Sequence, residues 1–509
     1  MEYKYLGVWI DQRLTFKTEV DYLRTRAMAR VNVMKAMTHH TAGASSAVLR
    51  LFYIHAIRPI IDYAAPALTS IAATWQLQLN TIQHLAMRTI VGAPPWTQTG
   101  TLEAETGLVP LNIRVKQLTA GRVGKVLRDQ NTVIRNCLAG YYDPSYNNSR
   151  KWGPQTARAF ATMVIDGPEH ATNSDPPDPG YTSPPPWTSS IITYSHTLLP
   201  GTRAECFGAE MRQHALQSME ALHTPGERTY YTDGSVDPST GATGSAYVID
   251  GEVTSWRNNN FLSTLQTELV AIGAALVHAE GGPGITVTIH TDSKAALQTL
   301  QRTHHSDNVG LVTSILARAQ TLAAQGTRLR LNWIPSHVGL AGNERADEAA
   351  RLATKLPNPT SFIRPSLSHI REQARKSART QTRSIHEGMI MTSPSMKWYH
   401  QVTNFEPLAP DKHQNRATTV AIHRLRLGYR SWADIQPEGD GTICKHCNTL
   451  TDEPLLHYVL RCPATVQLRL NQPDVRPAGR REEAADIVKQ SCKDPQILQA
   501  VLKRFPPPR

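Results

Sequence analysis

The chain has 509 residues, of which 40% are hydrophobic and 6% aromatic, and its mean hydropathy is −0.36. This composition predicts a soluble, core-forming protein of two to four domains and excludes a disordered polymer and a membrane protein. An excess of 54 Lys and Arg over 42 Asp and Glu favours a polyanionic partner, nucleic acid before membrane. Six cysteines are too few for a disulfide scaffold, and the N-terminus has no secretion signal pattern. We therefore expect a reducing compartment, the nucleus or cytoplasm, and not secretion.

The first two hundred residues divide into a helical part and a connector. Residues 1–165 are predicted to be mostly helical after a short strand over Tyr5–Ile10. Residues 166–200 are rich in proline and poor in apolar residues, which predicts an extended, semi-rigid linker. Residues 201–225 then contain one short amphipathic lead-in helix.

A sheet is expected between residues 226 and 355. Strand patterns start at Arg228, Gly244, Ile285 and Leu329, and the order of elements is β-β-β-α-β-α-α-β-α. This order predicts a mixed five-stranded sheet with helices packed on it, within a multidomain α/β chain.

The remainder of the chain is basic and then rich in cysteine. Residues 361–430 hold twelve Arg or Lys and four Asp or Glu, a net charge of +8, so residues 356–430 are predicted to be a basic helical segment. This charge is explained either by contact with nucleic acid phosphates or by a solvated helix surface. Residues 431–470 contain a Cys/His cluster, and residues 471–509 are interpreted as a polar tail.

Four acidic residues lie where predicted strands end or helices begin: Asp233, Glu268, Asp292 and Asp347. Asp233 and Asp292 end strands, Glu268 is expected in the first turn of a helix, and Asp347 lies one turn into another. Carboxylates in such places can converge at one edge of a sheet, where they need cations. Two Mg²⁺ or Mn²⁺ ions about 4 Å apart could activate water for phosphodiester hydrolysis. A turn, a cap or a solvated face explains any one of these acids alone, but not the four together.

Four segments resemble the conserved blocks of type 1 ribonuclease H and occur in that family's order: Tyr231–Ser235, Gln266–Leu269, His290–Lys294 and Trp333–Asp347. The resemblance covers residues 226–355. It implies a ribonuclease H-like fold and cleavage of the RNA strand of RNA–DNA hybrids. It also implies that the four acids bind two Mg²⁺ (or Mn²⁺) ions.

The same resemblance extends to residues near the acids. It gives His337 a role in proton shuttling or product release, the alternative being a loop histidine without function. Gln266 and Asn343 are candidates for substrate contact, although a helix cap or a core hydrogen bond explains either nearly as well. Some family members grip the hybrid with a basic protrusion, whereas Thr303–Gly326 contains only Arg318 and no Lys. We therefore expect the basic segment after residue 361 to supply the grip.

Cys444, Cys447, His457 and Cys462 have the residue types and spacing of a closed, tetrahedral Zn²⁺ site. His446 lies inside the Cys-x-x-Cys pair and could replace His457, although the spacing favours His457. The alternative is three reduced cysteines and a surface histidine. We predict one structural zinc ion.

Five segments outside the sheet resemble parts of non-LTR (LINE-type) retrotransposon polyproteins: Tyr5–Phe16, Arg58–Pro66, Thr99–Pro110, Ile422–Tyr429 and Leu456–Pro463. The first three resemble the thumb and connection of a reverse transcriptase, and the last two resemble the region after ribonuclease H. The resemblance implies that the Cys/His cluster is a zinc knuckle that binds nucleic acid, with single-stranded RNA as a candidate.

No Asp-Asp dipeptide occurs in the chain, whereas a polymerase palm needs this pair for its own metals. We therefore expect no polymerase activity from this chain. Two alternatives to a ribonuclease stay open. One is a catalytically inert remnant that binds nucleic acid, and the other is the C-terminal part of a complete reverse transcriptase.

Overall fold

The computed structural model describes residues 2–38, 43–128, 133–141, 145, 149–164, 190–201, 205–280, 284–302, 305–409, 415–429, 441–470 and 480–508. Most of the predicted proline-rich linker lies outside these residues. The chain forms two compact units. The helical unit comprises Met1–Ala120, Pro144–Met163 and Ala374–Arg509, and the sheet unit comprises Gly121–Asp143 and Val164–Gln373.

The sheet unit is built on one mixed sheet in the order β3-β8-β7-β4-β5-β6. Its strands are β3 (Ile192–His196), β4 (Arg228–Val236), β5 (Thr243–Ile249), β6 (Glu252–Asn258), β7 (Thr286–Thr291) and β8 (Arg328–Trp333). β4 pairs in parallel with β7 and antiparallel with β5, and β7 pairs in parallel with β8. The mixed α/β fold is confirmed, with six strands where five were expected. The additional strand is β3, which lies within the predicted linker and pairs in parallel with β8.

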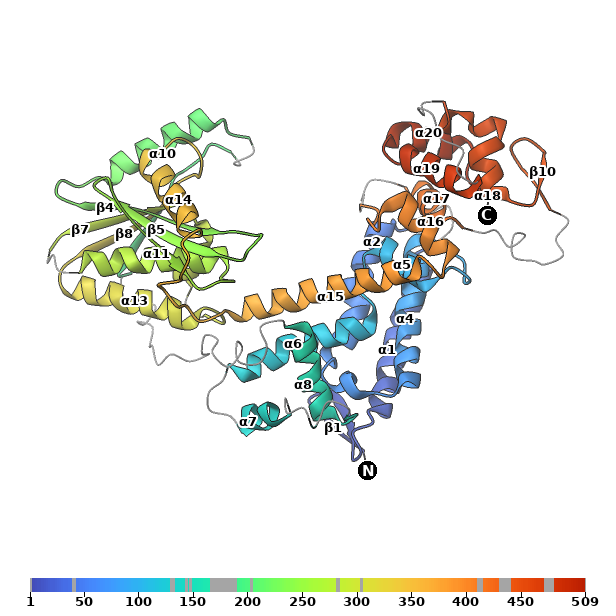
Figure 1. Cartoon of the computed structure of the whole chain (residues 1–509), viewed down its shortest axis with the longest axis horizontal. Coiled ribbons are helices and arrows are strands. Elements are labelled where there is room, and N and C mark those ends of the chain that lie inside the picture. The colour runs from blue at the N-terminus through green and yellow to red at the C-terminus, as the bar shows by residue number, and fades with distance from the viewer. Residues whose placement is uncertain are drawn as a thin grey trace. The chain divides into compact units, whose positions relative to one another are not determined.

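Helices cover both faces of this sheet (Figure 1). They are α10 (Gly208–Leu222), α11 (Thr264–Ala279), α12 (Lys294–Leu300), α13 (Val309–Ala324) and α14 (Ala341–Ala353). Helices α11, α12 and α13 share a buried core with β4, β7 and β8, which includes Leu269, Ile289, Val312 and Leu331. Helix α14 packs on the opposite face through alanines, which contact Ala246 of β5 and allow a close approach.

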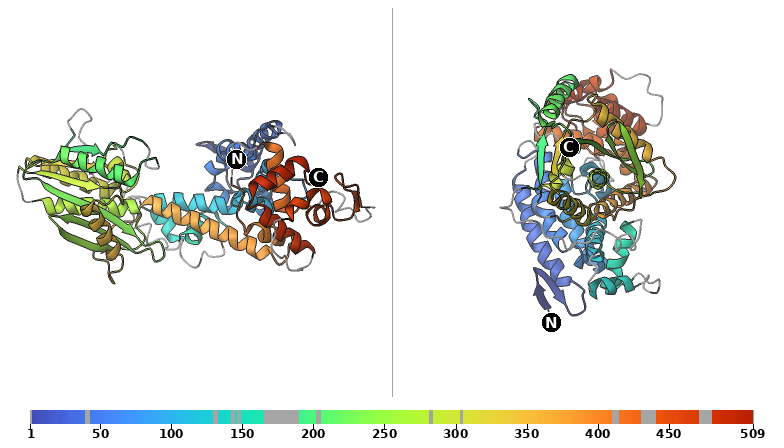
Figure 2. Two further views of the ribbon diagram at one scale, coloured as in Figure 1. Left: turned by 90° about the horizontal axis from the view of Figure 1, so that it is seen from above. Right: turned by 90° about the vertical axis from the view of Figure 1, so that its left-hand side faces the viewer.

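The helical unit begins with a hairpin of β1 (Glu2–Tyr5) and β2 (Val8–Asp11). The single strand predicted over Tyr5–Ile10 was wrong, because Leu6 and Gly7 have positive φ and turn the chain. Among the described residues, ten further elements lie wholly or partly in this unit: α1 (Lys17–Ala36), α2 (Ser46–Phe52), η1 (Tyr53–Ile57), α3 (Arg58–Tyr63), η2 (Ala67–Ser70), α4 (Ala73–Val91), α5 (Thr99–Thr106), α6 (Leu111–Leu127), α8 (Trp152–Met163) and α15 (Leu367–Met389). The short helix α7 (Val133–Gly140) belongs to the sheet unit. Helices α6 and α15 each extend across a boundary between the two units, and α15 is uninterrupted (Figure 2).

The C-terminal part of the helical unit contains short elements: α16 (Pro394–Thr403), α17 (Arg416–Leu427), β9 (Thr442–Ile443), β10 (Leu450–Thr451), α18 (Pro454–Leu456), η4 (His457–Arg461), η5 (Pro463–Leu468), α19 (Arg480–Ser491) and α20 (Pro495–Arg504). The predicted polar tail thus contains two helices. Their apolar residues recur at helical spacing and are buried, as at Ile487, Val488, Leu498 and Val501.

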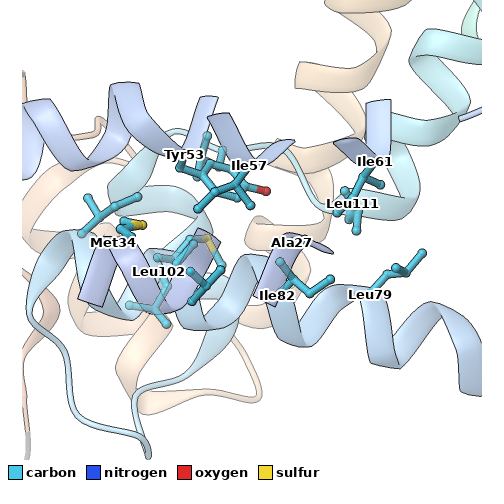
Figure 3. Packing of buried hydrophobic residues seen from close by; sticks show 14 of the residues in the cluster. Ala27, Met34, Tyr53, Ile57, Ile61, Leu79, Ile82, Leu102 and Leu111 are labelled. Atoms are coloured by element: carbon cyan, nitrogen blue, oxygen red, sulfur yellow. The ribbon is translucent and has the colours of Figure 1, made fainter. Parts of the chain in front are cut away.

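The core of the helical unit combines residues from both ends of the chain. Ala27, Tyr53, Ile57 and Ile82 pack together among the N-terminal helices (Figure 3). Tyr399 and Leu427 belong to the same cluster, although they come from α16 and α17. The segments that were predicted separately as residues 1–165 and 356–430 therefore contribute to one core. Among the described helices, none has the length and apolar character needed to cross a membrane.

Candidate active site

Three of the predicted acids meet at one edge of the sheet. Asp233 lies on β4, and Asp292 follows directly after β7. Because β4 and β7 are parallel and pair Thr232 with Thr291, the two carboxylates emerge side by side. Glu268 completes the group from α11, and ligand atoms of the three residues lie within 4.8 Å of one another.

The backbone of β4 must approach α11 closely to bring Glu268 to this edge. Gly234 follows Asp233, and a Cβ atom on it would lie only 2.5 Å from the Glu268 backbone nitrogen. Glycine is therefore required at this position. An Asp-Gly pair is typical of a turn, but here it is part of an extended strand, so Asp233 lies within β4 and not at its end as predicted. Helix α11 starts at Thr264, so Glu268 is one turn further into the helix than predicted.

The acid cluster is largely buried, and its three side chains all carry the same sign of charge when ionised. Asp233 is 5% exposed and Glu268 is 4% exposed. Burial, followed by the charges of Asp292 and Asp347, raises the pKa of Asp233 to about 7. Burial and the charge of Asp233 also raise the pKa of Glu268 well above its ordinary value. Oε2 of Glu268 has no hydrogen-bond partner among the described residues. Buried carboxylate oxygens in this state are suited to binding a hard divalent cation.

Asp347 lies on α14 in a second, more exposed group with His337 and Glu344, whose ligand atoms also lie within 4.8 Å of one another. The structure therefore places the four predicted acids in two adjoining groups, and Asp347 acts on Asp233 through its charge. His337 has a positive φ of 55°. Glu344 was not predicted as a site residue. It accepts a hydrogen bond from the Gly339 backbone at 3.1 Å, which ties the His337 loop to α14.

Asn343 and Gln266 are buried, and both side chains contact protein groups. Nδ2 of Asn343 lies 3.5 Å from Oδ2 of Asp292, so it contacts the acid cluster from α14. Gln266 forms a reciprocal capping box with Ser263 at the start of α11. Its Nε2 also donates to the Arg364 carbonyl at 3.0 Å. For Gln266, these contacts support the cap rather than substrate binding.

Two further residues of the same sequence blocks, Trp333 and His290, are neighbours of the acids, and Trp333 contacts one of them. Nε1 of Trp333 donates to the Asp292 carbonyl at 3.0 Å and holds the end of β7. His290 is buried beneath this edge, where Asn332 lies 3.1 Å from its Nδ1. Burial lowers the pKa of His290 to about 4, so this imidazole is neutral at physiological pH and does not offset the acid charges. The sequence contained one signal for Trp333 and His290: each lies in the same sequence block as one of the predicted acids.

The Cys/His cluster forms a second, separate candidate site in the helical unit. Cys444, Cys447, His457 and Cys462 offer ligand atoms that all lie within 4.8 Å of one another. The Cys444 and Cys462 sulfur atoms are 3.9 Å apart, close to the ~3.8 Å edge of a tetrahedron with Zn–S bonds of about 2.3 Å. His446 is outside the group, because its Nε2 lies 2.9 Å from the Pro506 carbonyl.

The local backbone explains this arrangement. β9 and β10 pair as a short hairpin that carries Cys444 and Cys447 in its turn. η4 carries His457 at its first residue and ends just before Cys462. A hydrogen bond with Thr449 contributes most to lowering the pKa of Cys447 to about 6, which favours the thiolate that a metal requires. The four residues thus fit a closed zinc site.

Comparison with known proteins agrees with the geometry of the sheet unit. Residues 225–355 match the RNase H family. Over 135 residues the chain is 23% identical to a Drosophila melanogaster protein named "Probable RNA-directed DNA polymerase from transposon BS". That similarity covers 26% of this chain and 15% of the relative. Residues 225–355 therefore form an RNase H domain, in a chain that is related to a transposon-encoded protein.

Proposed function

We propose that the RNase H domain hydrolyses the RNA strand of RNA–DNA hybrids at the acid cluster of Asp233, Glu268 and Asp292. The observation that carries this proposal is the convergence of three carboxylates at one sheet edge, two of them almost fully buried. Such a cluster is costly to hold without a cation. A site whose acids need a divalent metal is suited to phosphodiester hydrolysis.

The carboxylates would hold Mg²⁺ or Mn²⁺, two ions in all when Asp347 is included. Oε2 of Glu268, which lacks a partner among the described residues, fits this requirement. The bound ions would supply a nucleophilic water and stabilisation of the leaving oxygen. The protein's own contribution is to orient the oxygens. Gly234 allows α11 to approach, and Trp333 and Asn343 contact Asp292.

His337 is suited to moving a proton or assisting product departure at this site. It lies in an exposed loop, and one of its nitrogens is within 4.8 Å of a carboxylate oxygen of Asp347. The hydrogen bond between Glu344 and Gly339 keeps the loop close to α14. An imidazole placed beside a metal-binding carboxylate can exchange protons with solvent.

The remainder of the chain supports a place in a retrotransposon-derived protein. We assign one structural Zn²⁺ to Cys444, Cys447, His457 and Cys462, which form a closed set with no open position for catalysis. The N-terminal helices are proposed to be a thumb and connection, and the Cys/His region a nucleic-acid-binding knuckle.

The test is hybrid cleavage by the purified full-length chain with Mg²⁺. Asp292→Asn preserves size and removes one metal-binding charge, so cleavage should be lost while hybrid binding is retained. Asp250→Asn is the matched control, since Asp250 is an exposed turn residue between β5 and β6 of the same unit. Cleavage by Asp292→Asn at the rate of Asp250→Asn would remove the acid cluster from the reaction. Hybrid binding without cleavage by the unaltered chain would instead favour an inert nucleic-acid-binding protein.

A further inference from the structure

The loop between α12 and α13 carries a carboxylate that caps a distant helix. Asp307 accepts hydrogen bonds from the backbone nitrogens of Leu367 at 2.7 Å and Ser368 at 2.8 Å. These nitrogens belong to the first turn of α15, where helix N–H groups lack partners of their own. Nη1 of Arg128 lies 3.8 Å from Asp307 on the other side. The start of α15 is thereby fixed to the sheet unit.

The segment before α15 is fixed to the start of α11, the helix that carries Glu268. Ser361 accepts a hydrogen bond from the Asn259 backbone at 2.9 Å, and the Ile363 nitrogen donates to the Asn259 side chain at 2.7 Å. The Arg364 carbonyl then accepts from Gln266. Gln266 precedes Glu268 by two residues on α11. The backbone at Arg364 is therefore held at the end of α11 that carries a catalytic candidate.

Two arginines of this fixed segment have exposed side chains, Arg364 and Arg371. Other cations of the basic segment are used differently. Arg416 is buried and donates to the Thr89 carbonyl, while Arg426 is buried and binds Glu105. The basic side chains of residues 361–430 are thus of two kinds. Some are buried and bind other groups of the helical unit, and others are exposed, among them Arg364 and Arg371 of the sheet unit.

We propose that Arg364 and Arg371 form a phosphate-contact surface for the hybrid beside the acid cluster, with Asp307 as the residue that positions it. The inference rests on the proposed function for its substrate. It follows from the connection of the α12–α13 loop to α15. That loop carries no basic protrusion of its own. Its acid, Asp307, instead holds the start of α15, the helix on which Arg371 lies. Guanidinium groups are suited to phosphate oxygens because they offer paired donors.

The first experiment measures binding of a short RNA–DNA hybrid to the full-length chain, without Mg²⁺, over a range of salt. Each phosphate contact contributes about 0.7–0.9 to the slope of log affinity against log salt, so Arg364→Gln with Arg371→Gln should reduce the slope by about 1.4–1.8. The control is Arg318→Gln with Arg328→Gln, which removes two arginine charges of the same unit. Arg328 is exposed, and Arg318 is half-buried and pairs with Glu280. Arg328 starts β8 at the sheet edge opposite Asp292. Equal slopes for the two double variants would overturn the proposal.

The second experiment tests Asp307 by cleavage kinetics. Asp307→Ala should raise KM toward that of the Arg364→Gln, Arg371→Gln chain and leave kcat unchanged. Asp307→Asn should restore KM only in part, since its single amide oxygen can accept one of the two backbone hydrogen bonds and its NH2 group cannot accept the other. In the double-arginine variant, Asp307→Ala should add nothing. An unchanged KM, or a fall in kcat alone, would contradict the positioning role. An unaltered chain that binds the hybrid but does not cleave it would refute the proposed function and leave the binding result valid.

Discussion

Glu105 offers the sharpest stability prediction, because it is a fully buried carboxylate that joins distant parts of the chain. It lies on α5 and accepts from Nε of Arg426 at 2.9 Å and from Nδ1 of His423 at 2.6 Å, both on α17. The Tyr399 hydroxyl on α16 donates to it at 2.9 Å. Replacement by glutamine keeps the size of the side chain and removes its charge.

The magnitude follows from what the substitution leaves behind. The Arg426 side chain is only 9% exposed and the Glu105 side chain 0%, so the guanidinium would stay buried without a counterion. Breaking a buried pair from one side costs about 3–5 kcal/mol. The helical unit is somewhat larger than 250 residues, so about 2 °C per kcal/mol applies, and Glu105→Gln should lower its melting temperature by roughly 6–10 °C.

The assay is calorimetric unfolding of the full-length chain, with Glu482→Gln as control. Glu482 also pairs with a cation, Lys397, but its side chain is 38% exposed, and such surface pairs contribute about 0–1 kcal/mol. Hybrid cleavage at low temperature should be unchanged in both variants. If Glu105→Gln and Glu482→Gln unfold at the same temperature, the buried network does not hold the unit together.

The pH dependence of this unit has a definite sign. Burial alone would raise the pKa of Glu105, but the hydrogen bond from His423 and the charge of Arg426 outweigh it and lower the pKa below the ordinary value of 4.5. The folded carboxylate therefore binds its proton less readily than the unfolded one. Its stabilisation is fully present above pH 4.5 and is lost as the pH falls through the lower folded pKa. Glu105→Gln should flatten the acid limb of the stability profile.

Three other outcomes are expected. Gly234→Ala should abolish cleavage while hybrid binding is retained, because the added Cβ would displace α11 and with it Glu268; single-turnover kinetics beside Gly208→Ala, at an open position of the same unit, would measure this. Cys462→Ser should remove one equivalent of Zn²⁺, detected by metal analysis, with cleavage of short hybrids retained; a folded, reduced chain without zinc would contradict the site. His337→Ala should lower kcat by about 10²–10⁴-fold, because the reaction loses a group that transfers a proton, and steady-state kinetics of hybrid cleavage would measure this.

The sequence alone predicted most residues of both candidate sites, because each site depends on short-range patterns. Asp233 lies on a recognisable strand and Asp292 directly follows another, and the parallel pairing of these strands brings the two acids to one edge. Cys444 and Cys447 are three residues apart, and a Cys-x-x-Cys turn brings such sulfurs together whatever surrounds them. The positions of these residues could therefore be predicted before any long-range contact was known.

Only the tertiary structure decided which residues act together over long separations. It separated Asp347 into a group with Glu344, added β3 to the sheet, and placed Arg426 in a buried pair where the sequence showed an ordinary basic residue. It also showed that Asp307 caps a helix that starts sixty residues later. Charge and periodicity in a sequence indicate whether each side chain is charged, polar or apolar, but not which residue it will contact. Whether an arginine faces a phosphate or a buried glutamate depends on the partner that folding brings to it, and that partner has no local sequence pattern.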